Sequence, residues 1–349
     1  MDTERLTILY ERKPCYDIVF SQSFEDLTTE LEQLSLQGKK ICIVTDSNVE
    51  PLYANELKTL LEASSGKVVV YSFPAGEESK NLDTVKNIYE FLILEKFDRK
   101  DLLIALGGGV VGDMTGFVAA TYMRGIDFYN IPTTFLSQVD SSIGGKVAID
   151  FCGVKNIIGA FYQPKCVVID SDVLSTLDKR QLSAGIAESI KMAATFDKEL
   201  FNLLLNTKDF YKDVDTIIEK SLKIKRDVVE KDPKEKNLRK VLNFGHTIGH
   251  AIESAGEMNM LLHGECVGLG MLPMSSPHVA ESIRSALEKY NLPTEFNVSN
   301  ETLISYILHD KKMAGNQITV IFCNEIGTFE MKKIGADEIE NLVKGGKNA

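Results

Sequence analysis

The stretch Asp101-Leu102-Leu103-Ile104-Ala105-Leu106-Gly107-Gly108-Gly109-Val110-Val111-Gly112 decides how the first half of the chain folds. Its short apolar run predicts a buried strand, which leads directly into three consecutive glycines. Glycine allows a tight backbone turn before a helix, and we expect that helix over residues 113–123. A strand, a glycine turn and a helix in this order are typical of a parallel sheet covered by helices.

The same alternation extends to both sides of this stretch. Short runs rich in β-branched residues alternate with longer segments whose apolar residues recur at helical spacing. We therefore predict an α/β domain built on a parallel sheet in the first half of the chain. The expected strands cover residues 40–45, 67–73, 101–106, 128–131 and 167–170, and the expected helices cover 51–62 and 82–96.

The texture of the sequence changes after Asp170, because long amphipathic segments of mixed charge replace the β-branched runs. We expect a boundary near residues 172–178 and divide the chain into domains 1–174 and 175–349. The second domain is predicted to be mostly helical. Its expected helices cover residues 182–195, 198–205, 214–229, 243–254 and 279–290, and a small strand is expected at 318–322.

Length and composition place the chain among globular proteins. It has 349 residues, which favours two domains of roughly 150 residues each. Hydrophobic residues make up 44% and charged residues 26%, which excludes a disordered or fibrous chain. The net charge of −11 and the pI of about 5.1 disfavour a nucleic-acid partner or an anionic membrane, since both are bound through excess lysine and arginine.

The expected location is the cytoplasm. No apolar run approaches the ~18 residues that span a bilayer, and the first residues, Met-Asp-Thr-Glu-Arg, lack the basic-then-apolar order of a signal peptide. The six cysteines are scattered without a C-x-x-C pair, as expected of reduced thiols. We expect no membrane partner.

Residues 107–112 satisfy the pattern G-x-G-x-x-G at the end of a strand, where glycines let backbone amides approach a pyrophosphate. The pattern follows the third expected strand rather than the first, which puts an ordinary Rossmann register in question. Asp127 lies where a ribose-binding carboxylate would be sought, although the residues before it do not resemble the required strand. A nucleotide phosphate site is favoured over a turn that serves only tight packing, and both interpretations stay open.

A second loop is rich in hydroxyls, glycine and lysine. It includes Thr133, Thr134 and residues 138–146, with Lys155 and Asn156 close behind. Small residues and lysines suit a phosphorylated ligand. The alternative is a flexible surface loop, but the apolar residues interleaved with the polar ones favour a packed loop.

Three of the five histidines fall within eighteen residues. His246 and His250 are four apart, so on a helix both rings project from one face, and His263 follows thirteen residues later. Such a cluster favours a divalent metal site over a purely structural pair. Glu188 is the best candidate for a carboxylate ligand, because an unpaired charge in its apolar helical context would be costly. Lys191 lies one helical turn away on the same face.

Four blocks occur in order along the chain: residues 107–113 with 120–125, residues 132–156, residues 187–191, and residues 238–250 with 263–265. Together they resemble the 3-dehydroquinate synthase family of sugar-phosphate cyclases, over nearly the whole chain. The resemblance implies an α/β Rossmann-like NAD-binding domain with a parallel sheet, followed by a mostly α-helical domain that binds metal and substrate. It places the active site in the interdomain cleft.

The resemblance also implies roles for individual residues. It assigns a divalent metal, zinc or cobalt, to Glu188, His246 and His263. It places His250 beside the substrate, whereas the spacing alone would make His250 a metal ligand. It assigns Arg124 to the substrate phosphate of the neighbouring subunit. The other implied substrate contacts are Asp140, Lys146, Asn156, Lys191, Lys225, Arg239, Asn243, His250 and one of Lys311 and Lys312. The implied NAD contacts are Asp46, Asn48, Glu77, Lys80, Gly108, Gly109, Val110, Val111, Asp113, Thr133, Thr134 and Lys155.

The implied reaction converts 3-deoxy-D-arabino-heptulosonate 7-phosphate, a small phosphorylated sugar acid, to 3-dehydroquinate and phosphate in the shikimate pathway. NAD takes a hydride from C5, the resulting ketone acidifies the C6 proton so that phosphate leaves by β-elimination, and the hydride returns before an intramolecular aldol closure. A metal with open positions can lower the pKa of the hydroxyl that is oxidised. A homodimer is implied by the role of Arg124.

Three alternatives stay open. One is a cyclase that forms 2-deoxy-scyllo-inosose or a valiolone-type product, because substrate choice depends on few residues in the pocket. Another is a metal-dependent polyol dehydrogenase, which would produce stoichiometric NADH. A catalytically silent metal-binding protein is disfavoured, because buried charges without a ligand would be destabilising. The segment between Met271 and Asn291 is short for the family, which leaves its local helix packing open.

Overall fold

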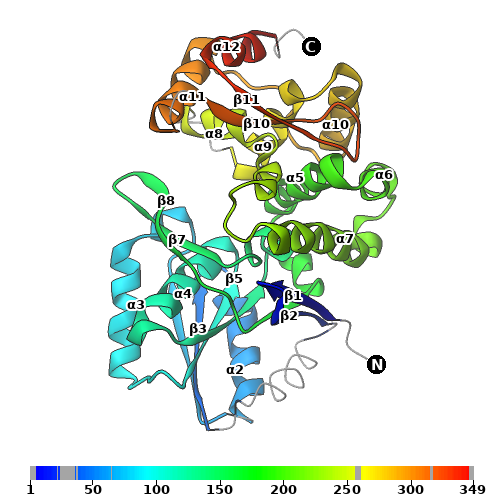
Figure 1. The fold of residues 1–349 in the computed structure, drawn as a ribbon. Helices are drawn as coiled ribbons and strands as arrows, with labels where there is room; N and C mark the ends of the chain where they lie inside the picture. Colours follow the sequence, from blue (N-terminus) through cyan, green and yellow to red (C-terminus); the bar gives the residue numbers. More distant parts are fainter. Residues whose placement is uncertain are drawn as a thin grey trace. The chain divides into compact units, whose positions relative to one another are not determined.

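The computed structural model describes residues 5–21, 23, 36, 38–63, 65–255, 261–314 and 317–345, without the side chains of 308–314, 336, 344 and 345. These residues divide into two compact units, residues 1–177 and 178–349, whereas the sequence suggested a division after residue 174 (Figure 1). Each unit is described by itself.

The first unit is built on a seven-stranded sheet with the strand order β1-β2-β9-β6-β5-β3-β4. All neighbouring strands are parallel except β1 and β2, which pair antiparallel. The predicted parallel sheet is thus confirmed, whereas β1 and β2 were not expected. The strands are β1 (Arg5–Tyr10), β2 (Lys13–Ser21), β3 (Lys40–Asp46), β4 (Lys67–Phe73), β5 (Leu102–Gly107), β6 (Asp127–Pro132) and β9 (Cys166–Asp170).

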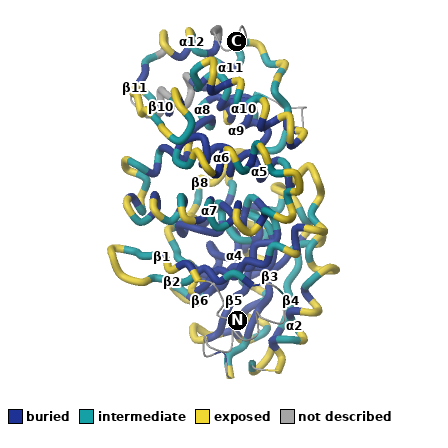
Figure 2. Tube along the Cα trace, turned by 90° about the vertical axis from the view of Figure 1, so that its right-hand side faces the viewer, coloured by how far each residue is buried: buried dark blue, intermediate teal, exposed yellow. Residues whose placement is uncertain are grey.

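Helices cover both faces of this sheet (Figure 1). Successive strand side chains point to opposite faces, so Ile104 of β5 joins the core beneath α2, whereas Leu103 joins the core beneath α3 and α4. Burial on both faces explains why β3, β5 and β9 are nearly continuous apolar runs (Figure 2). The helical segments are η1 (Glu50–Ala54), α2 (Asn55–Glu62), η2 (Glu77–Ser79), α3 (Leu82–Leu94), α4 (Gly109–Thr121), η3 (Tyr122–Arg124), η4 (Ser137–Ser141) and η5 (Asp172–Thr176).

Helix α4 begins at Gly109, four residues before the expected start at residue 113. The glycines therefore form the entry and the first turn of the helix instead of a separate loop. A Cβ on Gly107 would lie 2.5 Å from a methyl carbon of Val111, so only glycine fits at the end of β5. This tight entry brings the first backbone amides of α4 to the carboxyl end of the sheet.

A two-stranded hairpin, β7 (Lys146–Phe151) and β8 (Val154–Phe161), completes the first unit. Its turn contains Cys152 and Gly153, both in the left-handed region with φ of 50° and 77°. Two such residues are typical of the tight turns that join antiparallel strands. Val147 and Ile149 pack into the core beneath α3 and α4.

The second unit is mostly helical, as the sequence predicts. Helix α5 is buried almost all round, including the polar Ser189 and Thr195. Asp178 and Asp197 cap the first turns of α5 and α6 through their side chains. The elements are α5 (Lys179–Phe196), α6 (Lys198–Asn206), α7 (Phe210–Lys231), η6 (Leu238–Asn243), α8 (His246–Ala255), α9 (His263–Met271), η7 (Leu272–Met274), α10 (Pro277–Lys289), α11 (Asn300–Ala314), β10 (Ile318–Phe322), β11 (Glu330–Ile334) and α12 (Ala336–Gly345).

Three features of this unit differ from or refine the expectations. The helix expected from residue 243 begins at His246, because a 3₁₀ turn ends at Asn243 and Gly245 has φ of +78°. Helix α9 was not expected, although it carries His263. The short segment after Met271 forms η7 and α10, whose Val279, Ile283 and Leu287 are buried. Among the described helices, none has the length and apolar character needed to cross a membrane.

Candidate active site

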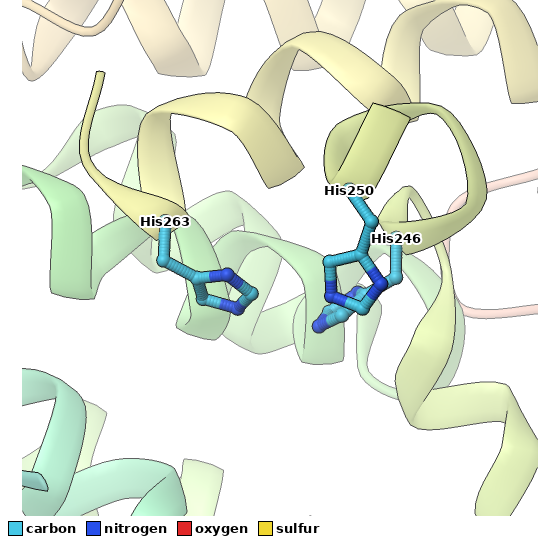
Figure 3. Close-up of side chains that lie close together, drawn as sticks. All are labelled: His246, His250 and His263. Atoms are coloured by element: carbon cyan, nitrogen blue, oxygen red, sulfur yellow. The ribbon is translucent and has the colours of Figure 1, made fainter. Parts of the chain in front are cut away.

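Close helix packing in the second unit brings three histidines together. Helix α9 packs against both α8 and α5. A Cβ on Gly249 of α8 would lie 2.8 Å from the carbonyl oxygen of Cys266, and a Cβ on Gly264 of α9 would overlap the carbonyl oxygen of Ala184. His246 and His250 of α8 and His263 of α9 thereby place ring nitrogens within 4.8 Å of one another (Figure 3).

Glu188 of α5 adds a carboxylate to this cluster. Its Oε1 lies 3.6 Å from Nε2 of His263 and 3.9 Å from Nε2 of His246. Its other oxygen, Oε2, accepts a hydrogen bond from Nζ of Lys191, and both residues are 1% exposed. Among the described residues, Oε1 of Glu188 has no hydrogen-bond partner. A buried oxygen without a partner, facing two imidazole nitrogens at these spacings, fits a metal about 2 Å from each atom.

In His246 and His263, the other ring nitrogen, Nδ1, faces a hydrogen-bond acceptor. Nδ1 of His246 lies 3.1 Å from the carbonyl oxygen of Phe244, and Nδ1 of His263 lies 3.3 Å from Oε2 of Glu253. A nitrogen against such an acceptor carries the ring proton, which leaves the lone pair on Nε2. Both lone pairs therefore point toward Glu188.

Charge and burial act differently on the two histidines. Burial lowers the pKa of His246 well below its usual value, and the positive charge of Lys191 lowers it further. Burial also acts to lower the pKa of His263, but the hydrogen bond that its ring donates to Glu253 and the charge of Glu188 outweigh this effect, so the pKa of His263 is raised. His246 is therefore neutral at pH 7, the form that can bind a metal.

A structured loop presents Arg239 and Asn243. The carboxylate of Asp232 accepts hydrogen bonds from the backbone N–H groups of Lys236, Asn237 and Arg239 at 2.6–3.1 Å. Burial acts to raise the pKa of Asp232, but these three donors lower it overall. Arg239 is 2% exposed and donates from Nη1 to the carbonyl oxygen of Pro233. Arg239 is therefore held in place by its own loop.

Among the other implied substrate residues of the second unit, Lys225, Lys311 and Lys312 lie on helices, and Asn243 ends η6. Lys225 of α7 is buried, and α7 is joined to α5 by a hydrogen bond of 2.9 Å between the hydroxyls of Ser221 and Ser189. Asn243 donates from Nδ2 to Oε1 of Glu235 at 2.7 Å. The side chains of Lys311 and Lys312, in α11, lie outside the described residues.

In the first unit, most of the implied NAD residues gather at the carboxyl ends of parallel strands. β3 ends at Asp46, β5 ends at the glycine turn, and β6 is followed by Thr133 and Thr134. A Cβ on Gly108 would lie 2.9 Å from the methyl carbon of Thr134, so the two loops touch. This edge is where open parallel sheets bind ligands. Asp127 lies at the amino end of β6, at the opposite edge, so it is not a ribose ligand of this turn.

Near α4, a buried lysine contacts three polar side chains at this edge of the sheet. Lys80 is 4% exposed, and its Nζ lies 2.7 Å from Oδ2 of Asp113, 2.5 Å from Oδ1 of Asn156 and 3.8 Å from Oε1 of Glu77. Burial raises the pKa of Asp113 to about 6, and the charge of Lys80 limits the rise. Lys80 thus joins residues implied for NAD with one implied for substrate.

Four other implied residues occupy the loops and hairpin of the first unit. Asp140 lies in η4, and Lys146 and Lys155 are exposed on the hairpin strands β7 and β8. A small pocket is lined by Asp113 and Lys146, among others. Arg124 ends η3, where Met123 and Arg124 have φ of 51° and 66°. This turn is held by Arg99, which donates two hydrogen bonds to the carbonyl oxygen of Met123.

Three supporting residues were missed from the sequence. Asp232 orders the loop of Arg239, Glu253 contacts His263, and Glu265 forms two hydrogen bonds of 2.7 and 2.8 Å with Arg180. A sequence signal was present for two of them, because Glu265 lies in the fourth block and Glu253 lies three residues after His250. Their roles are identified only by the groups that they contact in the structure.

Comparisons with known proteins agree on one family. The model described as 3-dehydroquinate synthase N-terminal matches residues 70–184, and the model described as 3-dehydroquinate synthase C-terminal matches residues 185–313. A 3-dehydroquinate synthase of Campylobacter concisus is 44% identical over 322 residues, which cover 89% of this chain and 92% of the relative.

Solved structures agree on the fold. A 2-deoxy-scyllo-inosose synthase, complexed with carbaglucose-6-phosphate, NAD⁺ and Co²⁺, has a TM-score of 0.85 at 24% identity over 98% of this chain and 100% of that one. A 2-epi-5-epi-valiolone synthase from Streptomyces hygroscopicus subsp. jinggangensis, with NAD⁺ and Zn²⁺ bound, has a TM-score of 0.86 at 24% identity over 99% of both chains. At this identity the two structures support the shared fold alone.

Proposed function

This chain belongs to the 3-dehydroquinate synthase family. We propose which of its residues bind the metal, NAD and the substrate in that family's reaction. The activity is that of a 3-dehydroquinate synthase, a lyase of the shikimate pathway whose substrate is a phosphorylated sugar acid. The observation that carries this function is the match of both family models and of a curated relative across most of the chain.

Glu188, His246 and His263 are proposed to hold a divalent metal, zinc or cobalt. The support is the unpartnered Oε1 of Glu188, which faces the Nε2 atoms of both histidines. When bound, the metal supplies a Lewis acid that lowers the pKa of a substrate hydroxyl. Lys191 balances the charge of Glu188, which lets a carboxylate remain ionised in a buried position.

The carboxyl edge of the sheet in the first unit is proposed to bind NAD. Gly108, Gly109, Val110 and Val111 offer the start of α4, which has no side-chain cap. The other proposed contacts are Asp46, Asn48, Glu77, Lys80, Asp113, Thr133, Thr134 and Lys155. When bound, NAD supplies a reversible hydride acceptor.

The substrate is proposed to be 3-deoxy-D-arabino-heptulosonate 7-phosphate. Lys146, Lys225 and Arg239 supply the cations that a phosphate and a carboxylate require, in a chain with a net charge of −11. His250 lies beside the proposed ligands and is exposed, which suits a group that moves a proton on the substrate side. The other proposed contacts are Asp140, Asn156, Lys191, Asn243, one of Lys311 and Lys312, and Arg124 from a second subunit.

The proposal includes the oligomeric state of the protein and its location in the cell. A homodimer follows from the role proposed for Arg124, which serves the neighbouring subunit. A cytoplasmic location is supported by the six cysteines, which all lie in described segments and are free thiols.

An assay of phosphate release tests the proposal. We expect the purified protein to release phosphate from the heptulosonate phosphate, to lose this activity with a chelator, and to regain it with zinc or cobalt. NADH should not accumulate, since NAD is regenerated. Faster turnover of another sugar phosphate, stoichiometric NADH, or full activity in verified metal-free protein would each contradict the proposal.

A further inference from the structure

Glu253 is a charged residue near the proposed metal site to which the proposed function gives no role. It lies on α8, seven residues after His246, and its side chain is 19% exposed. Its Oε2 lies 3.3 Å from Nδ1 of His263, the first residue of α9. Glu253 therefore connects two helices that are joined through residues 256–262, of which 256–260 lie outside the described part of the chain.

The two histidines proposed as ligands are oriented in different ways. His246 faces the carbonyl oxygen of Phe244, two residues before it, so its orientation is set by the local backbone. His263 faces a side chain on another helix. A substitution can remove this second partner without changing the backbone, so its contribution can be measured.

Glu253 is not placed to bind the same metal as His263. The two nitrogens of an imidazole ring point in different directions, and Glu253 lies on the Nδ1 side. The Nε2 atom of His263 is directed at Oε1 of Glu188, 3.6 Å away. The carboxylate of Glu253 thus acts on the ring from the side opposite to the proposed metal.

We propose that Glu253 is a positioning residue, which accepts the Nδ1–H of His263 and holds its Nε2 toward Glu188. This inference rests on the metal site of the proposed function. A carboxylate in this position keeps the proton on Nδ1 and restricts rotation of the ring, so the nitrogen that binds the metal is prepared before the metal arrives.

The test compares Glu253→Ala, Glu253→Gln and a control, Glu199→Ala, in which the removed carboxylate on α6 is 88% exposed. Zinc affinity is measured by competition with a chromogenic chelator, and the absorption spectrum of bound cobalt reports the geometry of the site. The state of the His263 ring is read by ¹⁵N NMR of metal-free protein labelled on histidine, at about pH 8.5, where a free imidazole is neutral.

We expect Glu253→Ala to bind zinc roughly 10- to 100-fold more weakly, the usual effect of losing such a partner. Its cobalt spectrum should change, and the Nδ1–H form of His263 should lose its dominance. Glu253→Gln should lose less affinity, because its amide oxygen can still accept the hydrogen bond. Glu199→Ala should match the parent protein in all three measurements.

The inference is overturned if Glu253→Ala binds zinc like the parent protein, or if it loses affinity while the His263 ring is unchanged. An equal loss in Glu253→Gln would also overturn it, since charge and not the hydrogen bond would then be responsible. If Glu253→Ala fails to fold, the NMR spectrum of Glu253→Gln decides. The Nδ1–H form of His263 should persist in this variant, and its loss would overturn the inference. If the parent protein binds no zinc, the proposed metal site fails, and the NMR measurement still tests the contact between Glu253 and His263.

Discussion

Glu188 and Lys191 are two opposite charges, each 1% exposed, one helical turn apart on α5. A buried charge is tolerated when it is paired, and each carboxylate oxygen here has a different neighbour: Oε2 faces Lys191 and Oε1 faces the histidines. Lys191 thus balances the charge of Glu188, whereas the histidines face the oxygen proposed to bind the metal. His246 and His250 also have different proposed roles: His246 binds the metal, and His250 moves a proton on the substrate.

His246→Ala should lower the metal content of the protein, whereas His250→Ala should not. His246 faces Glu188, so its loss removes one of three proposed ligands and should leave a poor metal site. His250→Ala should keep about one metal per chain while turnover falls roughly a hundredfold or more, the scale expected for a proton-transfer group. Elemental analysis of both purified variants, with His263→Ala alongside, decides the matter. The assignment is wrong if His250→Ala is metal-free and His263→Ala retains its metal.

Asp113 should make stability depend on pH. Because its pKa is raised from 3.8 to about 6, the folded state binds this proton more tightly than the unfolded state. The free energy of unfolding should therefore fall as pH rises from about 4 to about 6, by roughly 2–3 kcal/mol relative to Asp113→Asn. Urea unfolding of both proteins across this range measures the difference. A difference that does not vary with pH contradicts the raised pKa.

At the scale of elements, the proposed metal site depends on how closely α9 approaches its neighbours. Helix α9 contains three glycines in nine residues, a composition unfavourable for an isolated helix. It is stable because tertiary packing buries it, and glycine is what allows the helices to approach. The geometry of the histidines is therefore a property of helix packing and not of α9 alone.

Gly264→Ala should separate α9 from α5. The added Cβ would overlap the carbonyl oxygen of Ala184, a backbone atom that cannot rotate away. We expect a loss of about 1–3 kcal/mol in the free energy of unfolding, together with weaker zinc binding.

Gly268→Ala is the matched control, on the same helix. Its Cβ would lie 2.9 Å from Cδ2 of Leu287, the end of a flexible side chain that can move. Urea unfolding and zinc competition on both variants make the comparison. An equal effect of the two substitutions would show that contact with Ala184 does not set the site.

At the scale of the whole molecule, Arg124 is the residue proposed to act outside its own chain. Its backbone and that of Met123 are in the left-handed region, where residues other than glycine are strained. Arg99 holds this turn through the carbonyl oxygen of Met123. Arg99 thus supports the strained turn that carries Arg124.

Mixed dimers test whether Arg124 acts between subunits. Arg124→Ala and Lys191→Ala should each be nearly inactive, but a heterodimer of the two contains one complete site. Random mixing should restore activity to about a quarter of the parent level, since about half of the dimers are mixed and each has one working site. Co-expression with two affinity tags provides these dimers.

The control mixes Lys191→Ala with His250→Ala. Both of these residues are proposed to act within their own chain, so each site of the heterodimer lacks one of them and no activity should return. If the mixture of Arg124→Ala and Lys191→Ala also stays inactive, Arg124 does not serve the neighbouring site.

The sequence by itself determined the elements whose signal is local. The five strands expected in the first unit correspond to β3, β4, β5, β6 and β9, because short runs rich in apolar and β-branched residues are typical of the strands of a covered parallel sheet. The amphipathic helices α3, α6 and α7 were equally readable from their apolar spacing. Resemblance within the four blocks then identified the family, which the curated relatives confirm.

Only the tertiary structure decided the features that depend on contacts between elements. Helix α9 has a composition that argues against a helix, and the hairpin β7–β8 depends on a turn with two residues at positive φ. The contact of Glu253 with His263 joins residues of two helices, and no periodicity reports it. The physical reason is that local propensity is weak, and contacts between elements decide the outcome where the sequence pattern does not report them.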